Sequence, residues 1–310
     1  MSATRFFMTI LLGLTLVSTA AAQEIETKLN IPYADNDNPR QALDLYLPTA
    51  KSEKPRPVIV FIHGGGWRNG DKKSGRGRLL PFVRSGEYAG VSVGYRLTDE
   101  AQWPSQIHDC KAAIRWIRAH AGEYNLDPEK IGIMGTSAGG HLVAMLGTSG
   151  GLESLEGELG QHNDEDSRVT CVVDFYGPTE MLTMGKSPGL DHNAPGSPEA
   201  KLLGGPIQEV KEIARQASPI THVSKDDAPF LIIHGTNDPL VPFEQSTRFQ
   251  KKLKEAGVEA TLITIKDGKH GGFRNRQMDQ MIQAFFYKHL RGIERPIEDQ
   301  TLENEPRRQR

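Results

Sequence analysis

Continuous apolar runs with the length of β-strands alternate with segments of helical periodicity along most of the chain. Residues 57–62 are Pro-Val-Ile-Val-Phe-Ile, and the run Lys130–Met134 is followed at once by the helical segment Ala138–Leu146. Strands without polar alternation are typical of a parallel sheet covered on both faces. We therefore expect a three-layer α/β fold with a mostly parallel central sheet and helices on both faces. Further strands are expected over Glu26–Tyr33, Gln41–Pro48, Ala89–Leu97, Val169–Phe175, Ala228–Ile233 and Glu259–Ile265, and further helices over Ser105–Ala121, Phe243–Ala256 and Asn275–Leu290.

Charge and cysteine content narrow the classes of partner and cofactor. The chain has 37 basic and 39 acidic residues, so it lacks the basic excess that phosphate backbones attract, and we expect no nucleic-acid partner. Its two cysteines cannot build a disulfide framework or a Cys-rich zinc site. Cys110 and Cys171 could form one disulfide, but two buried free thiols are the favoured interpretation. Metal-binding His-Glu-x-x-His and Cys-x-x-Cys motifs and nucleotide-binding loops are absent, so no metal or organic cofactor is expected.

The first residues have the pattern of a secretory signal peptide. Arg5 supplies a positive charge, Phe6–Val17 is almost uninterruptedly apolar, and small residues precede Gln23. We expect residues 1–22 to be removed by cleavage after Ala22. An uncleaved membrane anchor is the alternative, but the apolar run is short for a membrane span. The expected location is secreted or periplasmic, without stable membrane insertion after cleavage.

Two segments differ in composition from the rest of the predicted α/β domain, which covers residues 23–290. Residues 178–227 are rich in Pro, Gly and polar residues, with one helical piece near Ile207–Gln216. An insertion of this size is expected to form a cap that shapes a pocket, although it could also be a passive surface excursion. Residues 291–310 are highly charged and are expected to form a disordered tail.

A Gly-x-Ser-x-Gly motif centred on Ser137 predicts a nucleophile. Gly147–Gly151 also matches this pattern, so the motif alone is not specific. Ser137, however, directly follows a predicted buried strand and precedes a helix, as in the sharp turn that exposes a catalytic serine above a sheet. Ser149 instead follows a helix and opens a glycine-rich loop, where it is expected to end the helix.

A serine nucleophile requires a base and an acid, which in this strand–turn–helix arrangement follow it in the order acid, then histidine. Only His270 and His289 come after a suitable acid. His289 lies at the end of a predicted helix, whereas His270 lies in a loop after the last strand, so His270 is the predicted base. Asp238 follows a buried strand and a turn and is the predicted acid, with Asp174 as its rival.

Acyl transfer also creates an oxyanion that requires preorganised N–H donors. The sequence His-Gly-Gly-Gly-Trp at residues 63–67 follows the first central strand, and we expect donors from Gly65, Gly66 and Ala138. Trp67 and Tyr95 are candidates for the wall of the substrate pocket, but large aromatic residues near strand ends are as often part of the core.

The motifs His-Gly-Gly-Gly-Trp (63–67), Gly-Thr-Ser-Ala-Gly-Gly (135–140), His-Gly-Thr-Asn-Asp-Pro-Leu-Val-Pro (234–242) and Gly-Lys-His-Gly-Gly (268–272) occur in this order. Together they resemble the α/β-hydrolase superfamily, and within it the esterases with a His-Gly-Gly-Gly motif, as in hormone-sensitive-lipase-like enzymes. The chain is most similar to bacterial secreted feruloyl and acetylxylan esterases, over about residues 40–290. The resemblance implies the α/β-hydrolase fold and ester hydrolysis without a metal or organic cofactor, with the triad and oxyanion residues assigned above.

The function that these predictions favour is a secreted serine esterase that forms an acyl-enzyme. Its expected substrates are short-chain acyl esters, free or linked to polysaccharide, such as acetyl or feruloyl decorations. A peptidase or amidase on the same fold is an alternative, because the same triad cleaves amides. A catalytically inactive hydrolase fold that serves as a binding protein is a third interpretation, disfavoured because every triad residue is present.

Overall fold

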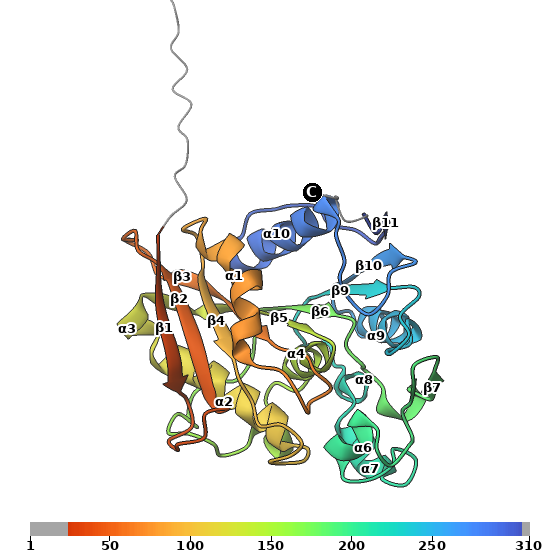
Figure 1. Ribbon diagram of the computed structural model, residues 1–310. Helices are drawn as coiled ribbons and strands as arrows, with labels where there is room; N and C mark the ends of the chain where they lie inside the picture. The colour runs from red at the N-terminus through yellow and green to blue at the C-terminus, as the bar shows by residue number, and fades with distance from the viewer. Residues whose placement is uncertain (1–23, 306–310) are drawn as a thin grey trace, which may run out of the picture.

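The computed structural model describes residues 24–305, and the predicted signal peptide lies outside this range. Its centre is a nine-stranded sheet with the order β1-β2-β4-β3-β5-β6-β9-β10-β11 (Figure 1). The pairs β1–β2 and β2–β4 are antiparallel, and all other pairs are parallel. The strands are β1 (Ile25–Pro32), β2 (Ala42–Pro48), β3 (Arg56–Ile62), β4 (Ala89–Val93), β5 (Leu126–Thr136), β6 (Cys171–Phe175), β9 (Phe230–Gly235), β10 (Ala260–Lys266) and β11 (Gln300–Glu303).

Helices cover both faces of this sheet. One face carries α1 (Arg76–Val83) and α10 (Arg276–Arg291), whose apolar residues, including Phe285 and Phe286, pack in one buried cluster. The other face carries α2 (Ser105–Ala119), α4 (Ala138–Thr148) and α9 (Glu244–Glu255), which contribute to a second buried cluster. The expected mostly parallel, three-layer α/β fold is confirmed. The shorter helices are η1 (Lys72–Gly75), α3 (Ala121–Tyr124) and α5 (Glu153–Glu156).

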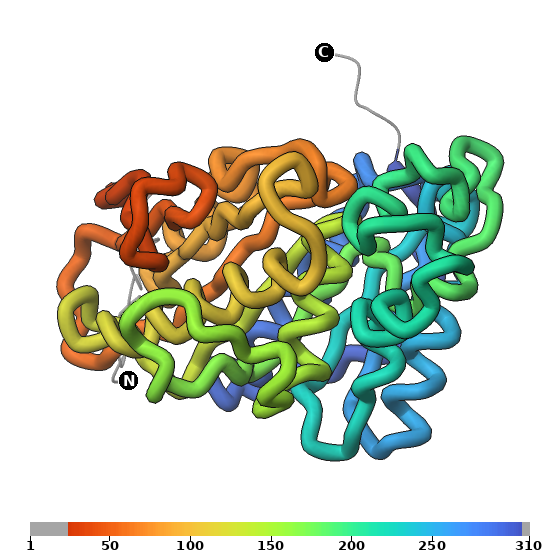
Figure 2. Tube along the Cα trace, turned by 90° about the horizontal axis from the view of Figure 1, so that it is seen from below, coloured from red at the N-terminus to blue at the C-terminus, as the bar shows by residue number. Residues whose placement is uncertain are grey.

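The insertion between β6 and β9 contains more regular structure than its composition suggests. The helical piece expected near residues 207–216 is α7, and it covers only Lys211–Gln216. Figure 2 shows the insertion, in green and teal, gathered at one end of the molecule. Its other elements are η2 (Met181–Thr183), the short antiparallel pair β7 (Lys186–Ser187) and β8 (Leu190–Asp191), α6 (Pro198–Leu203) and α8 (Pro219–His222).

The expectation of a disordered tail over residues 291–310 is wrong for Gln300–Glu303. These residues form β11, which pairs in parallel with β10 and buries Leu302. The side chain of Asp299 reinforces the pairing, because it accepts a hydrogen bond of 2.9 Å from the backbone N–H of Leu262. The free edge of β10 thus provides backbone partners that offset the low hydrophobicity of the segment.

Cys110 on α2 and Cys171 on β6 are both buried and unpaired, as the favoured interpretation expected. Within residues 24–305, no helix combines the length and the apolar character that a membrane span requires.

Candidate active site

Ser137 occupies a strained turn between β5 and α4. Its backbone has φ 55° and ψ −119°, a conformation that L-residues other than glycine rarely adopt. Two backbone hydrogen bonds of 2.9 Å hold it there, one from the Ser137 N–H to the carbonyl of Phe175 and one from the His141 N–H to the carbonyl of Ser137. The turn lifts the hydroxyl of Ser137 above the carboxyl end of β5, where Ser137 lines a cavity.

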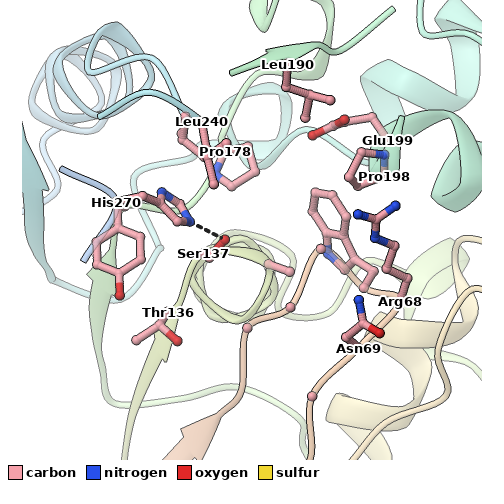
Figure 3. Close-up of a pocket in the computed structure, with 18 of the residues that line it drawn as sticks. Arg68, Asn69, Thr136, Ser137, Pro178, Leu190, Pro198, Glu199, Leu240 and His270 are labelled. Carbon is pink, nitrogen blue, oxygen red and sulfur yellow. Dashed lines mark hydrogen bonds between the residues drawn. The ribbon is translucent and has the colours of Figure 1, made fainter. Parts of the chain in front are cut away.

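A chain of hydrogen bonds links Ser137 to His270 and Asp238. Nε2 of His270 lies 2.9 Å from Oγ of Ser137, and Nδ1 of His270 lies 2.7 Å from Oδ2 of Asp238. Figure 3 marks the hydrogen bond between His270 and Ser137 with a dashed line. The three side chains come from the turn after β5, the loop after β10 and the loop after β9. The structure therefore brings together the three residues that the sequence predicts as nucleophile, base and acid.

Asp238 is held as an ionised carboxylate by its surroundings. Oδ1 accepts backbone hydrogen bonds of 2.8 and 3.0 Å from Leu240 and Val241, and Nε2 of His234 lies 3.3 Å from Oδ2. Burial alone would raise the pKa of Asp238, but the hydrogen bonds from His234, His270 and Leu240 hold it well below its usual range. The role of His234 was not predicted, although this residue lies next to the end of the buried strand that leads into Asp238.

The two rival residues have other partners. Asp174 is buried at the end of β6, and its Oδ1 accepts a hydrogen bond of 2.9 Å from the backbone N–H of Gly177. His289 lies on α10, where its Nε2 is 3.6 Å from a carboxylate oxygen of Glu259. Neither residue is hydrogen-bonded to Ser137 or His270 in the described structure.

The three residues predicted to supply the oxyanion donors lie at the cavity that Ser137 lines. Gly65, Gly66 and Ala138 all line it, and their N–H groups donate to no protein acceptor within residues 24–305. Gly65 and Gly66 have φ angles of 118° and 59°, which explains why glycine stands at both positions. The carbonyl of Gly65 accepts hydrogen bonds from the N–H groups of Arg68 and Asn69, which fixes the loop. Unpaired donors beside a nucleophile provide a site for negative charge.

Of the two residues predicted to line the pocket, Trp67 does so and Tyr95 does not. Trp67 lines the cavity, which has a volume of about 700 Å³. It is almost completely buried, and its indole N–H donates a hydrogen bond of 3.2 Å to Nδ1 of His141. Nε2 of His141 in turn donates to the carbonyl of Ala217 at 2.7 Å, and burial lowers the pKa of His141 to about 4, so its ring is neutral. His141 therefore orients Trp67.

Tyr95 does not line this cavity, which corrects the expectation. β4 ends at Val93, and Tyr95 turns beneath the glycine loop, where it is completely buried. Its hydroxyl donates a hydrogen bond of 2.9 Å to the carbonyl of His63, and its ring stacks on the His63 imidazole with the centroids 4.3 Å apart. Tyr95 thus supports the loop from below.

Residues 43–253 match the BD-FAE family, which is 211 of the 310 residues. The chain belongs to the BD-FAE family. This family assignment and the fold agree with the sequence resemblance to α/β-hydrolase esterases.

Three similar proteins illustrate the relationship of this BD-FAE member to known proteins. Esterase LipC of Mycobacterium tuberculosis is 32% identical over 221 residues, which cover 70% of the chain and 53% of LipC. A truncated carbohydrate esterase from gut microbiota is 34% identical with a TM-score of 0.79, covering 87% of this chain and 98% of that one. An acetyl ester–xyloside bifunctional hydrolase from Caldicellulosiruptor lactoaceticus is 26% identical with a TM-score of 0.64, and the match covers 78% of this chain and 86% of the hydrolase. The chain spans about half the length of the curated relatives it matches.

The cavity wall of this BD-FAE member also contains residues that were not predicted from its sequence. Many of them come from the insertion, where no strand or helix periodicity indicates which side chains face the site. The insertion residues that line the cavity are Pro178, Gly189, Leu190, His192, Gly196, Pro198 and Glu199. The insertion thus shapes the pocket, as a cap would.

Proposed function

We propose that the chain is a serine esterase that hydrolyses short-chain acyl esters through an acyl-enzyme. The observation that carries this proposal is the hydrogen-bonded series Ser137–His270–Asp238, in which Ser137 and His270 line the cavity. A strained serine turn, a histidine within hydrogen-bond distance of the hydroxyl and a buried carboxylate on the other ring nitrogen are the parts that nucleophilic catalysis requires.

In the proposed mechanism, Oγ of Ser137 attacks the ester carbonyl while Nε2 of His270 takes the hydroxyl proton. The carbonyl oxygen becomes an oxyanion, which accepts hydrogen bonds from the N–H groups of Gly65, Gly66 and Ala138. His270 then gives its proton to the leaving alcohol, and the acyl group remains on Ser137. A water molecule, deprotonated by His270, attacks the acyl carbon, the bond between this carbon and Oγ of Ser137 breaks, and His270 returns the proton to Oγ as the acid leaves. Asp238 stays ionised throughout and stabilises the imidazolium.

Short acyl groups on carbohydrate are the proposed substrate class. Support comes from the names of similar proteins, which include a carbohydrate esterase and an acetyl ester–xyloside hydrolase. The cavity of about 700 Å³ has room for an acetyl or a feruloyl group together with part of its alcohol.

Replacing the nucleophile tests the reaction class. We expect Ser137→Ala to lower kcat for 4-nitrophenyl acetate by about 10⁴-fold or more, because the acyl-enzyme cannot form. Ser149→Ala is the matched control: it carries the same change in the second Gly-x-Ser-x-Gly match, where the hydroxyl only donates to the carbonyl of Met145.

A fluorophosphonate probe gives an independent measurement, because it labels an activated serine covalently. Peptide mass spectrometry should locate the adduct on Ser137 in the wild type and find none in Ser137→Ala. Normal ester turnover by Ser137→Ala would refute the proposed mechanism.

We also propose that the protein is exported, with residues 1–22 acting as the signal peptide. The support is the charged, apolar and small-residue series described above. Expression in a bacterial host and N-terminal sequencing of the periplasmic or secreted product should give a chain that starts at Gln23. Retention of the full-length chain in the cytoplasm would contradict export.

A further inference from the structure

Glu199 is a buried acid in the wall of the cavity that has no role in the proposed mechanism. It lies in the first turn of α6 in the insertion, and only 3% of its surface is exposed. Figure 3 shows its carboxylate directed into the cavity beneath Leu190, on the far side from His270. A carboxylate almost never lies buried in a pocket wall unless charge and hydrogen bonds compensate its desolvation.

His192 lies beside one of the two oxygens of this carboxylate. Its Nδ1 lies 2.9 Å from Oε1 of Glu199, and its Nε2 donates to the carbonyl of Leu240 at 2.8 Å. Burial lowers the pKa of His192, but the neighbouring charge of Glu199 and the Leu240 carbonyl raise it above its ordinary value overall. The bond from Nε2 to Leu240 holds the imidazole beside the carboxylate, where Nδ1 and Oε1 form a close ion pair without an aligned hydrogen bond.

The other half of the carboxylate has no partner. Oε2 of Glu199 is buried and accepts no hydrogen bond from any described residue. The carboxylate is therefore short of donors, which costs free energy, and a ligand O–H that reaches it from the cavity recovers part of that cost. A carboxylate in this position favours a ligand with hydroxyl groups, because it accepts hydrogen bonds and repels anions.

The surroundings of Glu199 suit a polar ligand that is larger than a short ester. Arg68 and Asn69 lie on the same wall of the cavity (Figure 3) and also line a second hollow of about 580 Å³. The other residues that line this hollow are also polar: Thr98, Asp99, Gln102 and Lys201. The polar wall therefore extends outward from Glu199.

We propose that Glu199, oriented by His192, is a specificity-determining residue whose carboxylate accepts a hydrogen bond from a hydroxyl group of the substrate's alcohol portion. This inference rests on the proposed esterase function, because it concerns the same cavity. It assigns the selection of polyhydroxylated alcohols to one buried side chain of the insertion.

Two acetate esters of similar ring size test the proposal. Monoacetylated methyl β-xyloside carries free hydroxyl groups, and cyclohexyl acetate carries none. Each kcat/KM is divided by the rate constant of hydroxide-catalysed hydrolysis of the same ester, which removes the difference in intrinsic reactivity. We expect the normalised preference of the wild type for the xyloside to be at least about tenfold, as one hydrogen bond to a charged group provides.

Glu199→Gln is the test variant, because it removes the charge at nearly constant volume. We expect its normalised preference for the xyloside to fall about tenfold or more below that of the wild type. Glu212→Gln is the matched control: Glu212 belongs to the same insertion, but its side chain is 98% exposed and lies outside the cavity lining. Its preference should equal that of the wild type.

The outcomes separate this inference from the proposed function. A wild type that hydrolyses neither ester nor 4-nitrophenyl acetate refutes the esterase function and the inference with it. A wild type that hydrolyses 4-nitrophenyl acetate but shows less than tenfold normalised preference overturns only the inference. Equal losses of Glu199→Gln on both esters also overturn it, since they would show a structural role. If Glu199→Gln fails to fold, as thermal unfolding would reveal, the wild-type preference alone decides.

Discussion

At the scale of single residues, Asp174 makes stability depend on pH. This carboxyl group is fully buried at the end of β6, its Oδ2 has no partner, and burial raises its pKa from 3.8 to about 7. Between these pH values the folded protein keeps a proton that the unfolded chain has released. The free energy of unfolding therefore falls as pH rises from about 4 to about 7, by up to about 4 kcal/mol, and levels off above that range.

Asp174→Asn isolates this contribution, because the amide does not ionise. We expect the wild type to lose stability between pH 5 and pH 8 relative to the variant, as measured by urea unfolding at each pH. The difference between the two proteins should be smallest at pH 5, where Asp174 is protonated. Parallel stability profiles would show that Asp174 titrates at its ordinary value.

Individual residues also show which parts of the site can be predicted from the sequence. Ser137, His270 and Asp238 were found because each follows a buried strand, and the carboxyl ends of parallel strands meet at one edge of the sheet. The partners of His234 and Tyr95 could not be found this way. They depend on which direction a side chain takes after a strand ends, and β4 ends four residues earlier than its apolar pattern predicts.

At the scale of elements, the turn at Ser137 depends on close contact between α4 and the end of β3. A Cβ atom placed on Gly139 would lie 2.2 Å from the carbonyl oxygen of Ile62, which belongs to the backbone and cannot move aside easily. We expect Gly139→Ala to push α4 away from β3, to lower stability by about 1–3 kcal/mol and to reduce kcat, because Ser137 directly precedes the same helix.

Thermal unfolding and 4-nitrophenyl acetate turnover measure the two effects together. Gly122→Ala serves as the control, because a Cβ on this helical glycine of α3 would meet nothing within 4 Å. It should keep full activity and equal or exceed the stability of the wild type. A fully active and stable Gly139→Ala would contradict the packing argument.

Elements with strong periodicity were predictable, and those without it were not. The buried strands and α10 lie within a few residues of their expected positions, because core burial imposes a regular apolar pattern. β11 escaped prediction because only Leu302 is buried, and its stability comes from backbone pairing with β10. α1 was likewise not anticipated, since Pro81 and three arginines within or next to it weaken its helical pattern.

At the scale of the whole molecule, the site is assembled from both the sheet and the insertion. The sheet supplies the reacting side chains, and these follow from topology and motif. The insertion supplies much of the opposite wall, including Glu199, and its contacts arise from packing between distant segments. Trp103, for example, donates a hydrogen bond of 3.0 Å to Gln216, 113 positions away. Such pairs leave no periodic signal in one sequence.

The bond between His192 and the carbonyl of Leu240 has a consequence for engineering. The N–H of Leu240 donates a hydrogen bond to Asp238, and its carbonyl accepts one from His192 of the insertion. Leu240 therefore contacts both the catalytic acid and the insertion. Gly189 makes a second bond of this kind, to the carbonyl of Pro239. Chimeras that exchange substrate-recognition segments among related esterases should therefore transplant residues 239–241 together with the insertion, because a mismatched junction would disturb the acid while altering selectivity.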